Sequence, residues 1–242
     1  MNFQLDCLMK KWMVFFVAVF FFSLTASAQW TVLPGGGAGK KICVDNGRVW
    51  VLGMDDGIYS FNAGSWTQYP GNGKGKDIAV CNGVPYVIGT DDAIYKGTGS
   101  AWERLPGNGA GKRIYCDNGT VWVIGMDDGI YSFNGSGWTQ YPGGGKGKDI
   151  AVANGTPYVI GMDNAIYRGN GSNWEQLRGG GYGLAIYCGD NKPWVIGMDG
   201  GIYSFSNNAW VQYPGGGKGK DIAVYGAVPF VIGTDNGIYR GN

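Results

Sequence analysis

Gly71-Asn72-Gly73-Lys74-Gly75-Lys76-Asp77 is a glycine-rich stretch that ends in a lysine and an aspartate and leads into the apolar run Ile78-Ala79-Val80. Further copies, complete or degenerate, begin at a constant step of 36 residues, at Gly35, Gly107, Gly143, Gly179 and Gly215. Tryptophans follow the same step, at Trp30, Trp66, Trp102, Trp138, Trp174 and Trp210. A fixed period of this length is typical of a solenoid, a propeller or a linear array.

Each repeat contains four short apolar segments separated by turn signals. In the repeat that begins at Trp66, these segments are residues 66–69, 77–81, 85–89 and 93–96. Asn82-Gly83 is a two-residue hairpin turn, since both residues tolerate positive φ. No segment has helical periodicity. Four antiparallel strands repeated six times predict an all-β fold, a six-bladed β-propeller of four-stranded blades. The alternative is a linear β-solenoid, which needs capping ends that this repeat array lacks.

The two ends of the repeat array complement each other. The array begins with a single strand, Trp30–Leu33, and finishes after Ile238–Arg240 without a final tryptophan strand. We expect the N-terminal strand to pair with the C-terminal repeat, which closes the ring and removes an open sheet edge. The Ile-x-Val strand carries small residues and is expected to be innermost, with the tryptophan strand outermost.

Residues 1–28 have the features of a secretory signal peptide. Lys10 and Lys11 precede an apolar run, Trp12–Leu24, and Ala26-Ser27-Ala28 is a small-residue cleavage site. An uncleaved membrane anchor is the alternative, but the apolar run is short for a membrane span. We therefore expect a secreted protein, extracellular or periplasmic, that is cut after Ala28 and whose residues 29–242 form the propeller.

The charge of the chain excludes several classes of partner. Without residues 1–28 the chain has 17 basic and 17 acidic residues, and it has no histidine. A neutral chain lacks the basic surface that nucleic acid requires, and we expect no stable membrane insertion. The Asp-Asp turns offer calcium a few oxygen ligands, but they also suit a hairpin without metal, so we expect no metal site and no cofactor.

Four cysteines follow the signal sequence, Cys43, Cys81, Cys116 and Cys188. An even number in a secreted chain favours disulfides. However, Cys116 and Cys188 occupy a repeat position that is valine in the other four copies. We therefore expect the cysteines to be free thiols that pack as small apolar side chains.

The repeat pattern resembles tectonin repeats, which occur in tectonin-type and fish-egg lectins. The similarity is carried by Trp-x-x-Leu/Tyr-Pro-Gly, by Val-Trp in the third strand (Val49-Trp50, Val121-Trp122) and by the closing Ile-Tyr-Arg segments (Ile166–Arg168, Ile238–Arg240). It covers Trp30–Asn242 in six copies. The resemblance implies a six-bladed propeller that binds several glycans between its blades. The glycine-lysine loop is unusually rich in glycine for the family, and Val-Ile-Gly-Met/Thr-Asp replaces the more usual end of the third strand.

The glycine loop is expected to cross from one blade to the next, where a cleft with convergent polar groups is a plausible ligand site. Only the second, fourth and sixth repeats carry a tyrosine before Pro-Gly together with both lysines and the aspartate. We predict three equivalent carbohydrate sites, in which tyrosine stacks on a sugar and charged groups bind hydroxyls or a carboxylate. The predicted residues are Tyr69, Lys74, Lys76, Asp77 and Asp91; Tyr141, Lys146, Lys148, Asp149 and Asp163; and Tyr213, Lys218, Lys220, Asp221 and Asp235. The alternative is structural: glycines permit a tight crossover, and exposed ion pairs are often inert. We expect the repeat tryptophans to pack the blades.

These features predict a secreted, multivalent lectin whose partners are glycans. The alternative is an interaction scaffold that binds protein partners through one propeller face. We do not expect an enzyme, since no carboxylate is unique to one repeat and an active site normally breaks internal symmetry.

Overall fold

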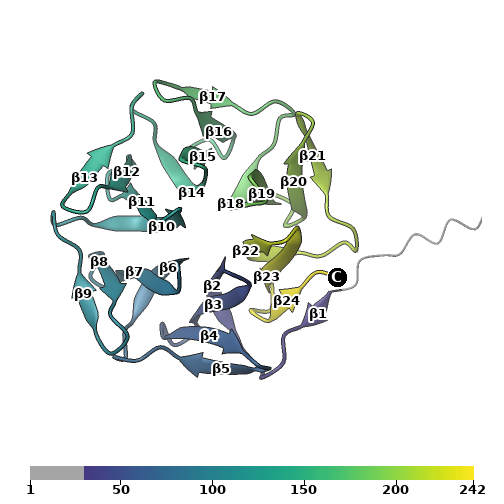
Figure 1. Cartoon of the computed structure of the whole chain (residues 1–242). Helices are drawn as coiled ribbons and strands as arrows, with labels where there is room; N and C mark the ends of the chain where they lie inside the picture. The colour runs from purple at the N-terminus through teal and green to yellow at the C-terminus, as the bar shows by residue number, and fades with distance from the viewer. Residues whose placement is uncertain (1–29) are drawn as a thin grey trace, which may run out of the picture.

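The structure, a computed structural model, describes residues 30–242, which form six four-stranded antiparallel sheets arranged in a ring (Figure 1). This confirms the predicted six-bladed propeller. Among the described residues no helix is long and apolar enough to cross a membrane. The predicted signal peptide, 1–28, lies outside them.

The strands follow the repeat closely. The first three blades comprise β2 (Gly39–Asp45), β3 (Arg48–Gly53), β4 (Ile58–Asn62) and β5 (Ser65–Gln68); β6 (Gly75–Cys81), β7 (Val84–Gly89), β8 (Ile94–Gly97) and β9 (Trp102–Arg104); and β10 (Gly111–Asp117), β11 (Thr120–Gly125), β12 (Ile130–Phe133) and β13 (Trp138–Gln140). The others comprise β14 (Gly147–Ala153), β15 (Thr156–Gly161), β16 (Ile166–Gly169) and β17 (Trp174–Gln176); β18 (Gly183–Gly189), β19 (Lys192–Gly197), β20 (Ile202–Ser206) and β21 (Ala209–Gln212); and β22 (Gly219–Tyr225), β23 (Val228–Gly233), β24 (Ile238–Arg240) and β1 (Thr31–Val32).

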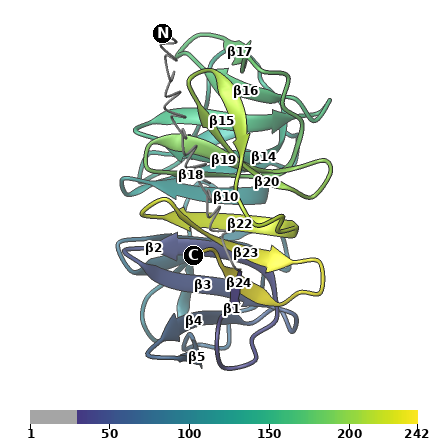
Figure 2. The same cartoon turned by 90° about the vertical axis from the view of Figure 1, so that its right-hand side faces the viewer.

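The sixth blade is completed by the N-terminal strand, as the sequence predicts. Strand β1 pairs antiparallel with β24, with Thr31 opposite Arg240 and Val32 opposite Tyr239. The two strands lie side by side in both views (Figures 1 and 2). The first strand of each blade lies at the axis of the ring and the tryptophan strand lies outermost (Figure 1), which also confirms the expected strand order.

The core consists of apolar layers that repeat in every blade. In the second strand of each blade, Leu52, Ile88, Ile124, Ile160, Ile196 and Ile232 are at most 1% exposed, and so are Ile58, Ile94, Ile130, Ile166, Ile202 and Ile238 in the third strand. Burial of each such side chain contributes roughly 1.5–3 kcal/mol. The constant 36-residue step therefore places two fully buried aliphatic residues in every blade.

The two faces of the propeller carry different kinds of turn. Asn82 and Gly83 have φ of 51° and 78°, as a tight two-residue hairpin requires. The glycine loops lie at the other end of the inner strands, beside the Asp turns of the preceding blade. The Gly75 amide donates to the Asp56 carbonyl at 3.0 Å, and Lys74 forms a β-bridge with Gly57. We call the side that holds glycine loops and Asp turns the Gly-loop face.

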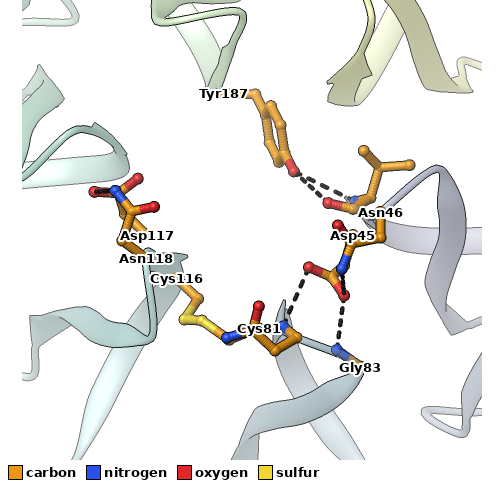
Figure 3. The surroundings of a disulfide bond; sticks show 10 residues. Asp45, Asn46, Cys81, Gly83, Cys116, Asp117, Asn118 and Tyr187 are labelled. Atoms are coloured by element: carbon orange, nitrogen blue, oxygen red, sulfur yellow. Dashed lines mark hydrogen bonds between the residues drawn. A yellow bond between two sulfur atoms is a disulfide. The ribbon is translucent and has the colours of Figure 1, made fainter.

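The expectation that all four cysteines are free thiols is wrong for two of them. Cys81 at the end of β6 and Cys116 of β10 form a disulfide between the second and third blades (Figure 3), with Cα atoms 5.8 Å apart. The two cysteines are 35 residues apart, one less than the repeat, so they hold consecutive repeat positions. Their side chains meet because the inner strands β6 and β10 lie side by side at the axis. Cys43 and Cys188 are free.

Candidate functional site

A pocket opens on the Gly-loop face of the second blade, where the glycine loop passes over the end of that blade. It has a volume of about 370 Å³. Its lining combines two aromatic side chains, a carboxylate, a lysine and the backbone of the loop and of strand β7: Asn72, Gly73, Lys74, Val87, Gly89, Thr90, Asp91, Tyr95 and Trp102. We call this arrangement the Trp–Tyr pocket.

The carboxylate of the pocket is fixed by its own turn. Asp91 accepts hydrogen bonds from the Ala93 amide through Oδ1 at 3.2 Å and from the Tyr95 hydroxyl through Oδ2 at 2.8 Å. The Tyr95 hydroxyl lowers the pKa of the Asp91 carboxyl, which is therefore ionised at neutral pH. Each carboxylate oxygen keeps a further acceptor site for a ligand.

The same turn is present in all six blades. The hydroxyl-to-carboxylate bonds join Tyr59 to Asp55, Tyr95 to Asp91, Tyr131 to Asp127, Tyr167 to Asp163, Tyr203 to Asp199 and Tyr239 to Asp235. Lateral pockets of about 310 Å³ recur in the third and sixth blades, lined there by Trp138 and Tyr131 and by Trp30 and Tyr239. The pocket therefore recurs in the second, third and sixth blades.

The tryptophan of the pocket packs against the glycine loop. A Cβ on Gly73 would lie 2.1 Å from the Trp102 Nε1 atom, so the ring lies directly on the loop backbone. The repeat tryptophans therefore pack the blades, as expected, and also line the pockets. Sequence reasoning missed Trp102 and Tyr95 as pocket residues, although the spacing Asp-x-x-x-Tyr in all six repeats was a usable signal.

The predicted site residues do not form one cluster. Lys74 and Asp91 line the same pocket, as do Lys218 and Asp235 in the sixth blade. Lys146 and Asp163 hold the same repeat positions in the fourth blade. The ammonium group of Lys74 also bonds to the Asp55 carbonyl of the preceding blade, and that of Lys76 bonds to Asp92 at 2.5 Å. Lys148 and Lys220 bond to Asn164 and Asn236.

The predicted tyrosines are half-buried between tryptophans. The ring of Tyr69 lies 5.9 Å from that of Trp50 and 5.2 Å from that of Trp102, and its hydroxyl accepts from the Gly99 amide at 2.7 Å. Tyr141 and Tyr213 occupy equivalent positions beside Trp122 and Trp194. These rings pack neighbouring blades together and are not part of the lining of the Trp–Tyr pockets in the second and sixth blades.

The predicted aspartates Asp77, Asp149 and Asp221 are buried in the axial channel, away from the lysines that precede them in sequence. Each accepts a hydrogen bond from an amide of the next inner strand, from Ile114, Ile186 and Ile42 at 2.8–2.9 Å. Their grouping with the predicted sugar site is therefore wrong. An aspartate at the start of one inner strand points toward the axis, where it cross-links two blades.

The channel aspartates alternate with cations. Lys41 lies 3.3 Å from Asp221, and Arg113 lies 3.4 Å from Asp149, while the fifth blade has Ala185 at the equivalent position. Burial raises the pKa of Asp221 to about 6, although Lys41 opposes the shift, and burial also raises that of Asp77. A cavity of only about 30 Å³ lies among these groups.

Two tyrosines lie in the channel next to these charged side chains. The rings of Tyr115 and Tyr187 meet edge to face with centroids 5.3 Å apart. The Tyr115 hydroxyl donates to the Cys188 carbonyl at 3.0 Å. The Tyr187 hydroxyl, seen in Figure 3, donates to the Val44 carbonyl at 2.9 Å. The small axial cavity is therefore unsuited to a sugar, and the lateral pockets are the better candidates.

Comparison with known proteins supports the fold. No family model and no curated protein sequence matches the chain. Solved structures with a similar fold include YCF48 bound to D1 peptide, with TM-score 0.60 and 12% identity over 88% of this chain and 96% of that one. A Bacteroides thetaiotaomicron protein of unknown function has TM-score 0.65 and 10% identity over 88% and 75%. The WD40 propeller domain of Doa1 has TM-score 0.63 and 12% identity over 90% and 97%. At 10–12% sequence identity, the structural similarity shows the β-propeller fold alone.

Proposed function

We propose that this chain is a secreted, multivalent carbohydrate-binding protein whose sugars bind in the Trp–Tyr pockets of the Gly-loop face. The observation that carries the proposal is the recurrence of one pocket, 310–370 Å³ in volume, in several blades. This volume is within the range of small-ligand sites.

The chemistry of the lining suits a sugar. Trp102 and Tyr95 offer apolar ring surface to the C–H face of a pyranose, while the ionised Asp91 accepts hydrogen bonds from hydroxyl groups. The loop backbone and Lys74 supply donors. The pockets of the second and sixth blades contain a lysine, whereas the third has Ala110 in its place. We propose that the three lysine-containing repeats form the stronger sites.

The proposal is one of binding without catalysis. A glycoside hydrolase needs one carboxylic acid with a raised pKa as proton donor. In the Trp–Tyr pocket the pKa of Asp91 is lowered instead, by Tyr95 and by the Ala93 amide. Asp91 is thus suited to accept hydrogen bonds and poorly suited to donate a proton.

A glycan array followed by titration calorimetry tests the proposal. We expect a stoichiometry near three per chain and a loss of about tenfold in affinity on average when Asp91→Asn, Asp163→Asn and Asp235→Asn are combined, since each removes a charge-assisted hydrogen bond. The control is Asp92→Asn, which changes the neighbouring residue that pairs with Lys76 outside the pocket. Absence of binding to any sugar by the folded protein contradicts the proposal.

A further inference from the structure

The fifth repeat breaks the symmetry of the Gly-loop face. Its loop carries Leu184 where the other five repeats have Lys40, Lys76, Lys112, Lys148 and Lys220. It also carries Tyr182 where the other repeats have lysine or alanine, and Ala185 at the position of the channel charges. Leu184 is 50% exposed and Tyr182 is 53% exposed. An apolar residue therefore occupies one position in a rim that is otherwise formed by lysines.

Leu184 lines a groove of about 520 Å³ near the mouth of the channel. The groove is also lined by Lys112, Arg113, Asp128, Gly147, Lys148, Ile160, Asn164 and Gly183. Three of these side chains are cationic and one is anionic. The groove thus joins an apolar end to a positively charged side.

Within residues 30–242 no carboxylate lies within ion-pair distance of Lys148, although its charge contributes to the lowered pKa of the nearby Asp163. In the first three blades the rim lysine is paired with an aspartate at 2.5 Å, as Lys112 is with Asp128. Lys148 instead donates to the neutral amide oxygen of Asn164 at 2.7 Å. Among the described residues its positive charge is therefore open to an external anion.

Arg113 also presents unused donors. Its Nη1 group donates to the Lys112 carbonyl at 3.0 Å, while its buried Nε has no hydrogen-bond partner within residues 30–242. The nearest carboxylate oxygen, in Asp149, lies 3.4 Å from Nε. A guanidinium presents five N–H donors in a fork that fits a carboxylate. The Arg113 side chain is 34% exposed, so an anion in the groove would meet its Nη groups, while the buried Nε faces the channel aspartates.

We propose that this groove is a second binding site, distinct from the Trp–Tyr pockets, that takes an extended peptide segment in which an acidic residue adjoins an apolar one. The acidic side chain lies between Lys148 and Arg113, and the apolar side chain covers Leu184. The positive charge of the groove favours an acidic side chain. The exposed Leu184 gives the apolar side chain a contact that a lysine at this position would not give.

Binding to immobilised hexapeptides tests the proposal. Their central residues, called the core, are Leu-Glu, Phe-Glu or Leu-Asp, flanked by Gly-Ser. The controls carry Gln or Lys in place of the acidic residue. Bound sequences are then measured by fluorescence anisotropy against the whole protein. We expect saturable binding of acidic cores that weakens with salt, at least tenfold weaker binding of the Gln cores and none of the Lys cores.

Matched variants locate the site. Leu184→Lys restores the residue of the other repeats and is expected to weaken binding about tenfold. Lys148→Gln is expected to weaken it about fivefold, while Lys76→Gln, at the same position in the second blade, leaves it unchanged. Leu184 and Lys76 do not line the Trp–Tyr pockets, so Leu184→Lys and Lys76→Gln leave sugar binding there unchanged, which separates this proposal from the lectin function.

The proposal is overturned if no core binds below millimolar concentration, if Leu184→Lys binds as tightly as the parent protein, or if Lys76→Gln and Lys148→Gln weaken binding equally. Displacement of the labelled peptide by sodium glucuronate at the same concentration as unlabelled peptide also overturns it, since the groove is then a site for sugar acids.

Discussion

At the scale of single residues, the glycine loop is determined by contact with tryptophan. At the six equivalent loop positions, Gly37, Gly73, Gly109, Gly145, Gly181 and Gly217, a Cβ would lie 2.1–2.5 Å from the indole Nε1 of a repeat tryptophan. Such a distance is far below a normal van der Waals contact. These glycines are therefore required by the packing of the tryptophan that lines each pocket.

Gly73→Ala tests this requirement. The methyl group forces Trp102 away from the loop, so we expect the free energy of unfolding to fall by about 2 kcal/mol, as for other overpacked sites. We also expect the proposed sugar binding at the second-blade pocket to be lost. Urea unfolding with Gly137→Ala as control checks the result, because Gly137 has no atom within 4 Å of the added methyl group. An unchanged unfolding midpoint for Gly73→Ala refutes the requirement.

The sequence predicts some of the residues that line the pocket, and a physical reason explains why it does not predict the others. Lys74 and Asp91 were predicted from polarity and position, and they do line one pocket. Asp77 follows Lys76 directly, yet strand alternation sends its side chain into the channel. Proximity in sequence therefore suggested a cluster that the pleat of the strand divides. Trp102 was predicted only to pack the blade. The sequence does not show that one part of its ring packs on the glycine loop while another part lines a pocket.

At the scale of the elements, adjacent inner strands are joined by polar contacts and by one covalent bond. Asp77 on β6 bonds to the Ile114 amide on β10, and the disulfide between Cys81 and Cys116 joins the same two strands near the opposite end. The aspartate contact recurs from the fourth to the fifth blade and from the sixth to the first. The disulfide occurs in one blade pair of the described chain.

Removing this disulfide lowers stability without changing the fold. Its sequence separation is 35 residues, and a closed loop of this size corresponds to about 3–4 kcal/mol in the chain-entropy view. We expect Cys81→Ala, combined with Cys116→Val, to lower the free energy of unfolding by roughly this amount. Cys188→Val is the control, because valine occupies that position in Val44, Val80, Val152 and Val224. Equal effects of a reductant on the parent and the double variant would contradict this role.

At the scale of the whole molecule, the repeat alone predicted the ring, and the strand at each end of the array predicted its closure. The pairing of Cys81 with Cys116 could not be predicted by aligning repeats, because the two residues hold different repeat positions and meet only between blades. The channel charges, in contrast, hold one repeat position, so aligning the repeats groups them, but the alignment does not show that their side chains face one another across the axis. Lys41, Asp77, Arg113, Asp149 and Asp221 come from five blades, and their interaction exists only when the ring is closed around the axis.

The buried carboxyls of the channel predict an unusual dependence of stability on pH. Burial raises the pKa of Asp221 to about 6, against about 3.9 in an unfolded chain. The folded state therefore binds this proton more tightly than the unfolded state, so its contribution is fully present below about pH 4 and is lost as the pH rises to about 6. Two pKa units correspond to about 3 kcal/mol. Asp77, whose pKa is also raised, acts in the same direction.

The chain has no histidine, so these carboxyls dominate the interval between pH 4 and pH 6. Urea unfolding at half-unit steps should show the free energy of unfolding falling across it, and Asp221→Asn should flatten the fall because the amide cannot ionise and its oxygen can still accept from the Ile42 amide. The control is Asp55→Asn. The Gly57 amide and the Tyr59 hydroxyl lower the pKa of Asp55, so it titrates below this interval and its removal leaves the slope unchanged. A stability that rises from pH 4 to pH 6 would mean that Lys41 and Arg113 outweigh burial, and that the ring stabilises the ionised aspartates.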